Sequence, residues 1–112
     1  MSAPVRLTRP TALVLFALAR GLRHGFDILD ATELPSGTVY PILRRLEHAG
    51  LVSSRWEPVR EARDAGRPPR RNYELTGAGA EVLREALARH PDVRALFAPP
   101  HGRPGMPVPR PA

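Results

Sequence analysis

The sequence has no cysteine, which excludes a disulfide framework, a thiolate metal site and a cysteine nucleophile. It also has no long apolar run: the longest uninterrupted one, residues 12–19, is far shorter than the roughly 20 residues that a membrane-spanning helix needs. No small-residue cleavage site follows this run, so we do not expect a secretory signal. These absences predict a soluble protein of the cytoplasm.

The 112 residues suffice for one small domain and not for two with ordinary cores.

The sequence also lacks recognisable catalytic motifs. No nucleophile, base and orienting group form a catalytic pattern, and no G-x-x-x-x-G-K phosphate loop is present. His24 and His48 each lack a second ligand at metal spacing. We therefore expect neither an enzyme nor a bound cofactor or metal ion.

Lysine is absent too, so all 17 basic residues are arginine, and against 11 acidic residues they leave a formal net charge of +6. Such an excess predicts an anionic partner. The excess is concentrated between residues 36 and 76, where eight arginines face five acidic residues. Guanidinium groups at this density suit phosphates or a narrow minor groove of DNA.

The carboxyl-terminal end differs in composition from the rest of the chain. Residues 99–112 contain six of the fourteen prolines, two arginines and no acidic residue. This segment cannot bury enough apolar surface to offset the entropy lost on folding. We therefore predict a disordered, proline-rich tail over residues 99–112.

Three helical segments are expected in the first half of the chain. Thr8 can cap a first helix, apolar nearly all round, that runs to Leu22. A short second helix over residues 24–32 has Phe26, Ile28 and Leu29 as its predicted buried side. A third helix follows a plausible cap at Ser36 and ends at Gly50.

The third helix, which we call the reader helix, has two contrasting faces. Its apolar stripe at helical spacing consists of Val39, Ile42, Leu43, Leu46 and Ala49. The opposite face collects Tyr40, Pro41, Arg44 and His48, with Thr38 and Arg45 on a flank. A solvated charged face is the common explanation of such arginines, but the neighbouring basic segment favours contact with DNA.

A hairpin and a last helix complete the pattern. Residues 51–57 and 71–75 alternate as two antiparallel strands, with Trp56 expected in the hairpin core against the helices. The connection over residues 58–70 is too long for a tight turn and is predicted to be a flexible loop. Together these segments form a wing that carries Arg60, Arg63, Arg67, Arg70 and Arg71. Thr76 can cap a helix to about His90, followed by one or two further turns over residues 92–98.

The predicted fold is mainly α with a small antiparallel β-hairpin, an α+β arrangement: a winged helix-turn-helix plus one C-terminal helix. The DNA-binding domain is predicted over residues 1–76, and a C-terminal helical region is predicted over residues 77–98. The reader helix and the wing are the predicted DNA contacts. Candidate DNA-binding residues are Thr38, Tyr40, Pro41, Arg44, Arg45, His48, Arg67, Arg70 and Arg71.

Over about residues 8–90 the sequence resembles the PadR-like family of transcriptional regulators. The resemblance rests on LVLFALARGLRHGFDI at residues 13–28, GTVYPILRRLEHAGLV at residues 37–52 and GRPPRRNYELT at residues 66–76. It implies a winged helix-turn-helix, a homodimer joined largely through the C-terminal helix, and operator binding that usually represses transcription. It places Tyr40, Arg44 and Arg45 on the reader helix, and Arg67, Arg70 and Arg71 in the basic wing.

The sequence departs from the family pattern in two places. Phe26 stands where a tyrosine is usual, and the helix before Pro91 is shorter than most members use for dimerisation. The expected function is a sequence-specific DNA-binding repressor that acts as a homodimer on a pseudo-palindromic operator. Two alternatives are a protein-interaction module with a proline-rich tail, and a sensor whose DNA affinity is set by a small aromatic molecule. For the sensor, Phe97 is the only candidate ligand contact.

Overall fold

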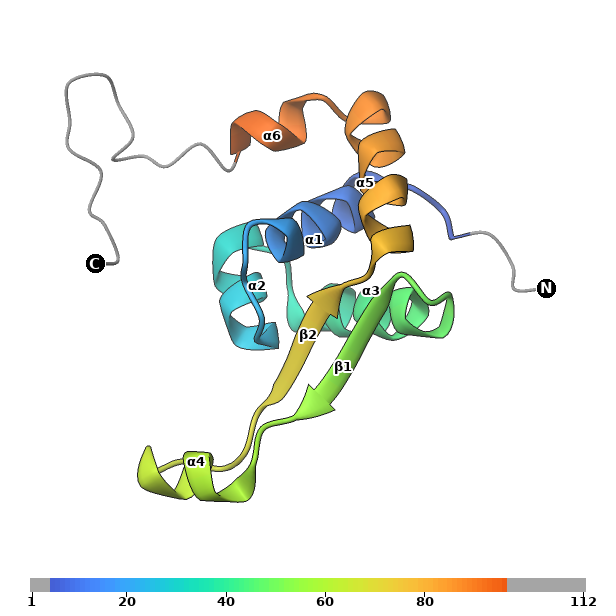
Figure 1. The fold of residues 1–112 in the computed structure, drawn as a ribbon. Coiled ribbons are helices and arrows are strands. Elements are labelled where there is room, and N and C mark those ends of the chain that lie inside the picture. The colour runs from blue at the N-terminus through green and yellow to red at the C-terminus, as the bar shows by residue number, and fades with distance from the viewer. Residues whose placement is uncertain (1–4, 97–112) are drawn as a thin grey trace, which may run out of the picture.

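The computed structural model describes residues 5–96, so the predicted tail and Phe97 lie outside the described residues. The elements in chain order are α1 (Arg9–Ala19), α2 (Gly25–Thr32), α3 (Ser36–His48), β1 (Val52–Trp56), α4 (Val59–Asp64), β2 (Arg71–Leu75), α5 (Gly77–Arg89) and α6 (Asp92–Leu96). All the described helices except α4 gather in one body, and the two strands extend from it to α4 (Figure 1). This arrangement confirms a mainly α fold with a small antiparallel hairpin.

Helix α1 lies at the centre of the helical body. Its residues from Thr11 to Leu18 are all buried, and it contacts α2, α3, α5 and α6. The Thr8 side chain accepts a hydrogen bond from the amide of Thr11 at 3.3 Å, as expected of a cap. The helix ends at Ala19 rather than at Leu22, because Gly21 takes a left-handed φ of 96°.

Helices α2 and α3 pack beside α1 and differ from the sequence expectation in two details. Phe26 was predicted to be buried, but it is 74% exposed, and Ile28 provides the fully buried contact of α2. Helix α3 starts at Ser36 with Pro35 as its extended N-cap residue, so the Ser36 side chain does not cap it. The apolar stripe of α3 is confirmed, with Val39, Ile42, Leu43 and Leu46 buried.

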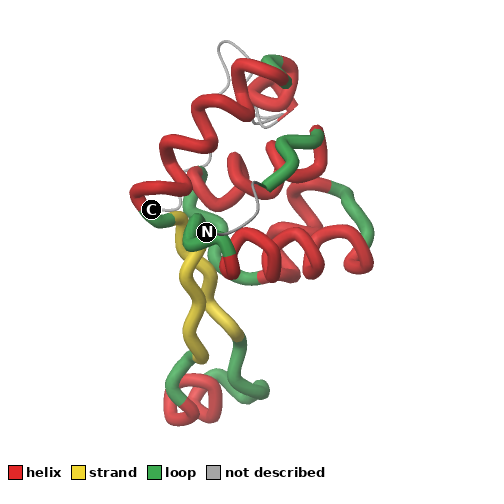
Figure 2. Tube along the Cα trace, turned by 90° about the vertical axis from the view of Figure 1, so that its right-hand side faces the viewer, coloured by secondary structure: helices red, strands yellow, loops and turns green. Residues whose placement is uncertain are grey.

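The wing, formed by β1, α4 and β2, projects from the helical body in both views (Figure 2). The strands are antiparallel and pair Val52 with Leu75 and Trp56 with Arg71. Trp56 is 61% exposed and does not pack on the helices, because it ends its strand far from the helical body. The connection is not an irregular loop: it contains α4, which buries Ala62. The helix-forming sequence VREARD between Pro58 and Gly66 explains this helix.

Helices α5 and α6 return the chain to α1. The Thr76 side chain accepts a hydrogen bond from the Gly79 amide at 3.1 Å and caps α5 as predicted. In α6, Val93 is fully buried, and Asp92 forms an ion pair with Arg9 at the start of α1. The C-terminal helices therefore belong to the same core as the helices before the wing.

Candidate nucleic-acid interface

The packing of α3 determines which of its side chains are presented to solvent. Its apolar stripe is buried against α1, so the opposite face is turned outward. On that face Tyr40, Arg44, Arg45 and His48 are exposed, and Thr38 and Pro41 are half-buried. The structure thus brings the six predicted reader positions together on one side of the molecule.

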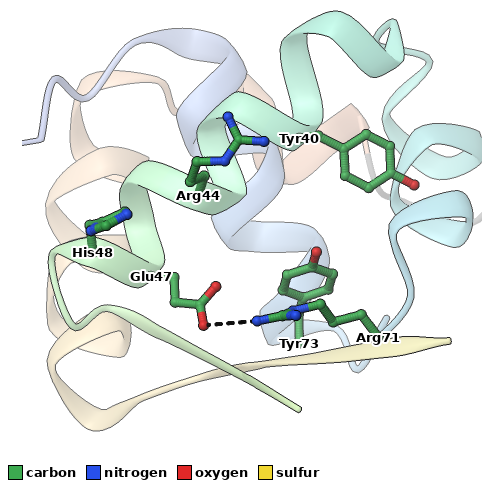
Figure 3. Close-up of a pocket in the computed structure, with 6 residues that line it drawn as sticks. All are labelled: Tyr40, Arg44, Glu47, His48, Arg71 and Tyr73. Carbon is green, nitrogen blue, oxygen red and sulfur yellow. Dashed lines mark ion pairs between the residues drawn. The ribbon is translucent and has the colours of Figure 1, made fainter. Parts of the chain in front are cut away.

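Tyr40 is held at the start of this face by a close approach to α2. A Cβ atom added to Gly25 would lie 2.5 Å from the Tyr40 hydroxyl oxygen and from one of its ring carbons. Figure 3 shows the ring directed toward α2, away from Arg44. The absence of a side chain at Gly25 therefore makes the room that the phenol ring occupies.

A cavity of about 540 Å³ separates α3 from β2 (Figure 3). Its lining residues are Tyr40, Arg44, Glu47, His48, Arg71 and Tyr73. Burial raises the pKa of the Tyr73 phenol above its ordinary value of 10.0, with an opposing contribution from Arg71. The phenol is therefore neutral at physiological pH and remains a hydrogen-bond donor. The cavity combines arginine, histidine and phenol donors, which are suited to phosphate oxygens and base edges.

One carboxylate, Glu47, lies among these donors. Its Oε2 atom accepts a 2.6 Å hydrogen bond from the Ser54 hydroxyl and lies 3.6 Å from Nη2 of Arg71. The Nε atom of Arg71 donates to the Ser54 oxygen at 2.9 Å, and the guanidinium carbon lies 5.3 Å from the centre of the Trp56 ring. Glu47 was missing from the predicted site, although its place one turn after Arg44 on α3 was a usable signal.

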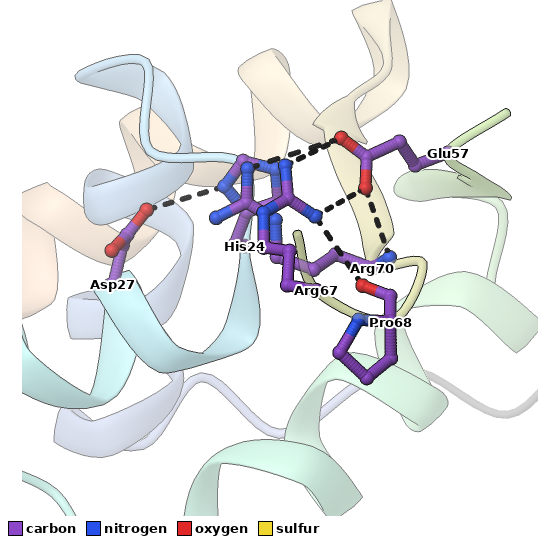
Figure 4. A network of polar contacts seen from close by, with 6 residues as sticks. All are labelled: His24, Asp27, Glu57, Arg67, Pro68 and Arg70. Atoms are coloured by element: carbon purple, nitrogen blue, oxygen red, sulfur yellow. Dashed lines mark hydrogen bonds and ion pairs between the residues drawn. The ribbon is translucent and has the colours of Figure 1, made fainter. Parts of the chain in front are cut away.

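A second carboxylate, Glu57, joins the two ends of the connection between the strands (Figure 4). Arg67 donates to both of its oxygens, with 2.8 Å between Nη2 and Oε2. The Arg70 amide donates to Glu57 Oε1 at 3.2 Å, and the Glu57 amide donates to the Arg70 carbonyl at 2.7 Å. The hydrogen bonds from Arg67 are the main cause that lowers the pKa of Glu57 to about 2, against the effect of burial.

The three predicted wing arginines consequently have different surroundings. Arg67 is held in the two-pronged contact with Glu57, a use that sequence reasoning did not foresee. Arg70 is exposed, with 4.0 Å between its Nη2 atom and Glu57 Oε2. Arg71 faces Glu47 on the side of α3. Contact between any of the three and DNA remains a prediction.

The sequence model of the transcriptional regulator PadR-like family matches residues 14–85 of this chain. The chain belongs to the PadR-like family. PadR-like proteins are DNA-binding transcriptional regulators and not enzymes, so this chain is a DNA-binding regulator. No curated protein matches the chain in sequence.

Solved structures support the family assignment. A PadR-like transcription factor from Bacteroides fragilis is similar to this PadR-like chain with 27% identity and a TM-score of 0.60, over 76% of this chain and 82% of that one. The protein smu.1704 from Streptococcus mutans is similar with 26% identity and a TM-score of 0.62, over 86% and 88% of the two chains. A PadR family regulator from Clostridium difficile shares the fold at 20% identity, with a TM-score of 0.64 over 80% and 95%.

Residues 5–96 of the PadR-like chain offer neither a metal-binding cluster nor a membrane-spanning helix. No group of three or more histidine or acidic side chains in this part of the chain could hold a metal ion. None of the helices in the same range is long and apolar enough to cross a membrane.

Proposed function

We propose that this PadR-like protein is a sequence-specific repressor that binds a pseudo-palindromic operator as a homodimer in the cytoplasm. The observation that carries the proposal is the outward face of α3. It presents Arg44, Arg45 and His48 beside the cavity that separates it from the wing. A helix of this kind enters the major groove, and a wing beside it contacts the backbone or the minor groove.

The side chains of α3 divide into two roles. Tyr40, near the start of the helix and beside α2, is suited to hydrogen-bond a backbone phosphate. Arg44 lies one turn later, is free of ion pairs shorter than 4.0 Å within residues 5–96, and can reach the edge of a guanine. Arg45, His48, Thr38 and Pro41 flank these two and complete the proposed contact with the groove.

In the wing, we assign the phosphate contacts to Arg70 and Arg71. Arg67 is assigned a supporting role, because its guanidinium already bridges both oxygens of Glu57. That pair fixes the shape of the connection between the strands and thereby the position of Arg70.

The homodimer is proposed from the size of the DNA contact. One reader helix and one wing cover little DNA, and specific recognition by such modules usually pairs two half-sites about one helical turn apart. A repressor of this type blocks transcription by occupying its operator.

The test uses the full-length protein and a pool of random duplexes. Rounds of selection at fixed salt should enrich one pseudo-palindromic sequence, and the logarithm of its binding constant should fall steeply with the logarithm of salt concentration. Failure to enrich any sequence, or binding that salt does not change, would contradict the proposal and favour a protein-interaction module.

A further inference from the structure

We propose that Glu47 limits the binding of this regulator to non-specific DNA by holding Arg71. The proposal rests on the DNA-binding function proposed above and concerns specificity within the same interface. Glu47 is here a positioning residue that acts through Arg71, and it is not assigned a contact with a base.

The contacts around Arg71 define the arrangement. Ser54 links the two charged groups, because its hydroxyl donates to Glu47 Oε2 at 2.6 Å and accepts from Arg71 Nε at 2.9 Å. The guanidinium carbon also lies over the Trp56 ring, 5.3 Å from its centre. Arg71 is therefore contacted by a carboxylate, a hydroxyl and an aromatic face, and Figure 3 shows its ion pair with the carboxylate.

The Glu47–Arg71 ion pair lies where it can affect DNA binding. Glu47 and Arg71 both line the cavity between α3 and β2, next to Arg44. Each is partly exposed, at 35% for the Glu47 side chain and 38% for that of Arg71. The ion pair therefore lies in the interface where DNA phosphates are expected, and not in the core.

A carboxylate in that place affects specific and non-specific binding differently. Non-specific affinity comes almost entirely from arginine and lysine contacts with phosphates. A phosphate that approaches Arg71 must compete with Glu47 for the guanidinium group. The negative charge of the Glu47 carboxylate also repels the phosphate. A random duplex depends on phosphate contacts and bears this cost in full, whereas at a specific site base contacts from α3 hold the protein even where Arg71 stays paired with Glu47. Glu47 thus weakens non-specific binding more than operator binding.

We expect the fold to tolerate removal of this carboxylate. The side chains that hold α3 in the core are Val39, Ile42, Leu43 and Leu46, all of which are buried. Glu47 lies outside this stripe and is only partly covered. Glu47→Gln keeps the shape of the side chain and removes its charge, so it tests the electrostatic role without a cavity.

The experiment compares full-length wild type, Glu47→Gln and Asp30→Asn on one random 25-base-pair duplex and on the selected operator. Asp30 lies exposed on α2, so its substitution matches the change in net charge outside the candidate interface. For Glu47→Gln, we expect random-duplex affinity to rise about three- to tenfold and the salt slope to steepen by about 0.9 for each protomer. Operator affinity should change less, and Asp30→Asn should match the wild type.

A double variant separates an effect through Arg71 from direct repulsion of DNA. In an Arg71→Gln background, Glu47→Gln should no longer raise random-duplex affinity. An equal rise in both backgrounds would overturn the role of Arg71. Ser54→Ala, which removes the linking hydroxyl and keeps both charges, should give a smaller rise, and it serves as the second variant if thermal unfolding shows Glu47→Gln to be misfolded.

The remaining outcomes distinguish this proposal from the one on which it rests. If the wild type shows no salt-dependent binding to duplex DNA, the proposed function fails and this inference fails with it. If the wild type binds but Glu47→Gln leaves random-duplex affinity unchanged, only the inference fails. A loss of operator affinity in Glu47→Gln without a rise on random duplex would instead identify Glu47 as a direct reader of bases.

Discussion

The arginine side chains of α3 and of the wing differ in how free they are to contact a phosphate. Arg44 and Arg45 project from α3 into solvent, whereas Arg67 and Arg71 are each held by a glutamate of the wing or of α3. A count of arginines therefore overestimates the number of DNA contacts. The pairing of each guanidinium decides its role.

Substitutions of Tyr40 and Arg44 should have effects that differ in kind. Tyr40→Phe removes one hydrogen bond without removing packing, so all duplexes should bind more weakly by about 1 kcal/mol. Arg44→Ala should cost about 1 to 3 kcal/mol at the operator, change random-duplex binding less, and relax preference at one base pair in each half-site. Titrations on operator, mutated operator and random duplex at one salt concentration measure this. Equal losses on operator and random duplex for Arg44→Ala would limit Arg44 to the backbone.

The depressed pKa of Glu57 makes stability depend on pH in a defined direction. The carboxyl titrates at an ordinary value of 4.5 when free and at about 2 in the folded protein. Its stabilising contribution is therefore complete above the ordinary value and is lost as the pH falls toward the folded value. Wild type should unfold at a higher temperature than Glu57→Gln at neutral pH, and the two should converge in acid. Thermal unfolding as a function of pH tests this, and a difference independent of pH would contradict it.

At the scale of elements, the approach of α5 to the start of β1 leaves no room for a side chain at Gly79. A Cβ atom there would lie 2.1 Å from the Leu51 carbonyl oxygen, which is backbone and cannot rotate away. We expect Gly79→Ala to destabilise the protein by about 1 to 3 kcal/mol. Gly77→Ala, on the same helix, meets nothing within 4 Å and should leave stability unchanged or slightly raised. Denaturant unfolding gives the free energy of unfolding of both variants. Equal values for Gly79→Ala and Gly77→Ala would contradict a tight contact between Gly79 and Leu51.

The sequence predicted those elements whose signal is local or periodic. Thr8 and Thr76 cap their helices as expected, and the apolar stripe of α3 places Arg44 on the outward face. The segment of α2 has only eight residues, too few for its periodicity to show that Phe26 faces solvent. Alternation puts Trp56 on the side of Val52 but cannot show that the helical body ends before it.

The unpredicted part of the site consists of contacts between separate elements. Glu57 and Arg67 are ten residues apart and meet only because α4 folds the connection back on itself. Likewise, Glu47 reaches Ser54 and Arg71 from a different element. Charge counts along the chain do not reveal such partners, because they depend on how the wing docks against α3.

For the whole molecule, the composition of the α5 surface bears on how two protomers associate. Its outward residues Glu81, Arg84, Glu85 and Arg89 are charged, and the large exposed apolar side chains within residues 5–96 all lie outside this helix. For the proposed homodimer, association through this surface would rely on ion pairs, which salt screens.

We therefore expect two protomers on each operator duplex, and self-association of the free protein that weakens as salt is added. Native mass spectrometry gives the stoichiometry of the complex, and light scattering over a salt series gives the association of the free protein. One protomer on a high-affinity duplex would exclude the homodimer. A free dimer insensitive to salt would point to an apolar interface instead of α5.

Helix α6 and the wing lie at opposite ends of the molecule in both views (Figures 1 and 2). Leu96, at the end of α6, is 56% exposed. Because the chain contains no cysteine, Leu96→Cys would introduce its only thiol at the end remote from the wing. Through that thiol the protein can be coupled to a sensor chip or a fluorophore in a single orientation, with the wing directed away from the support.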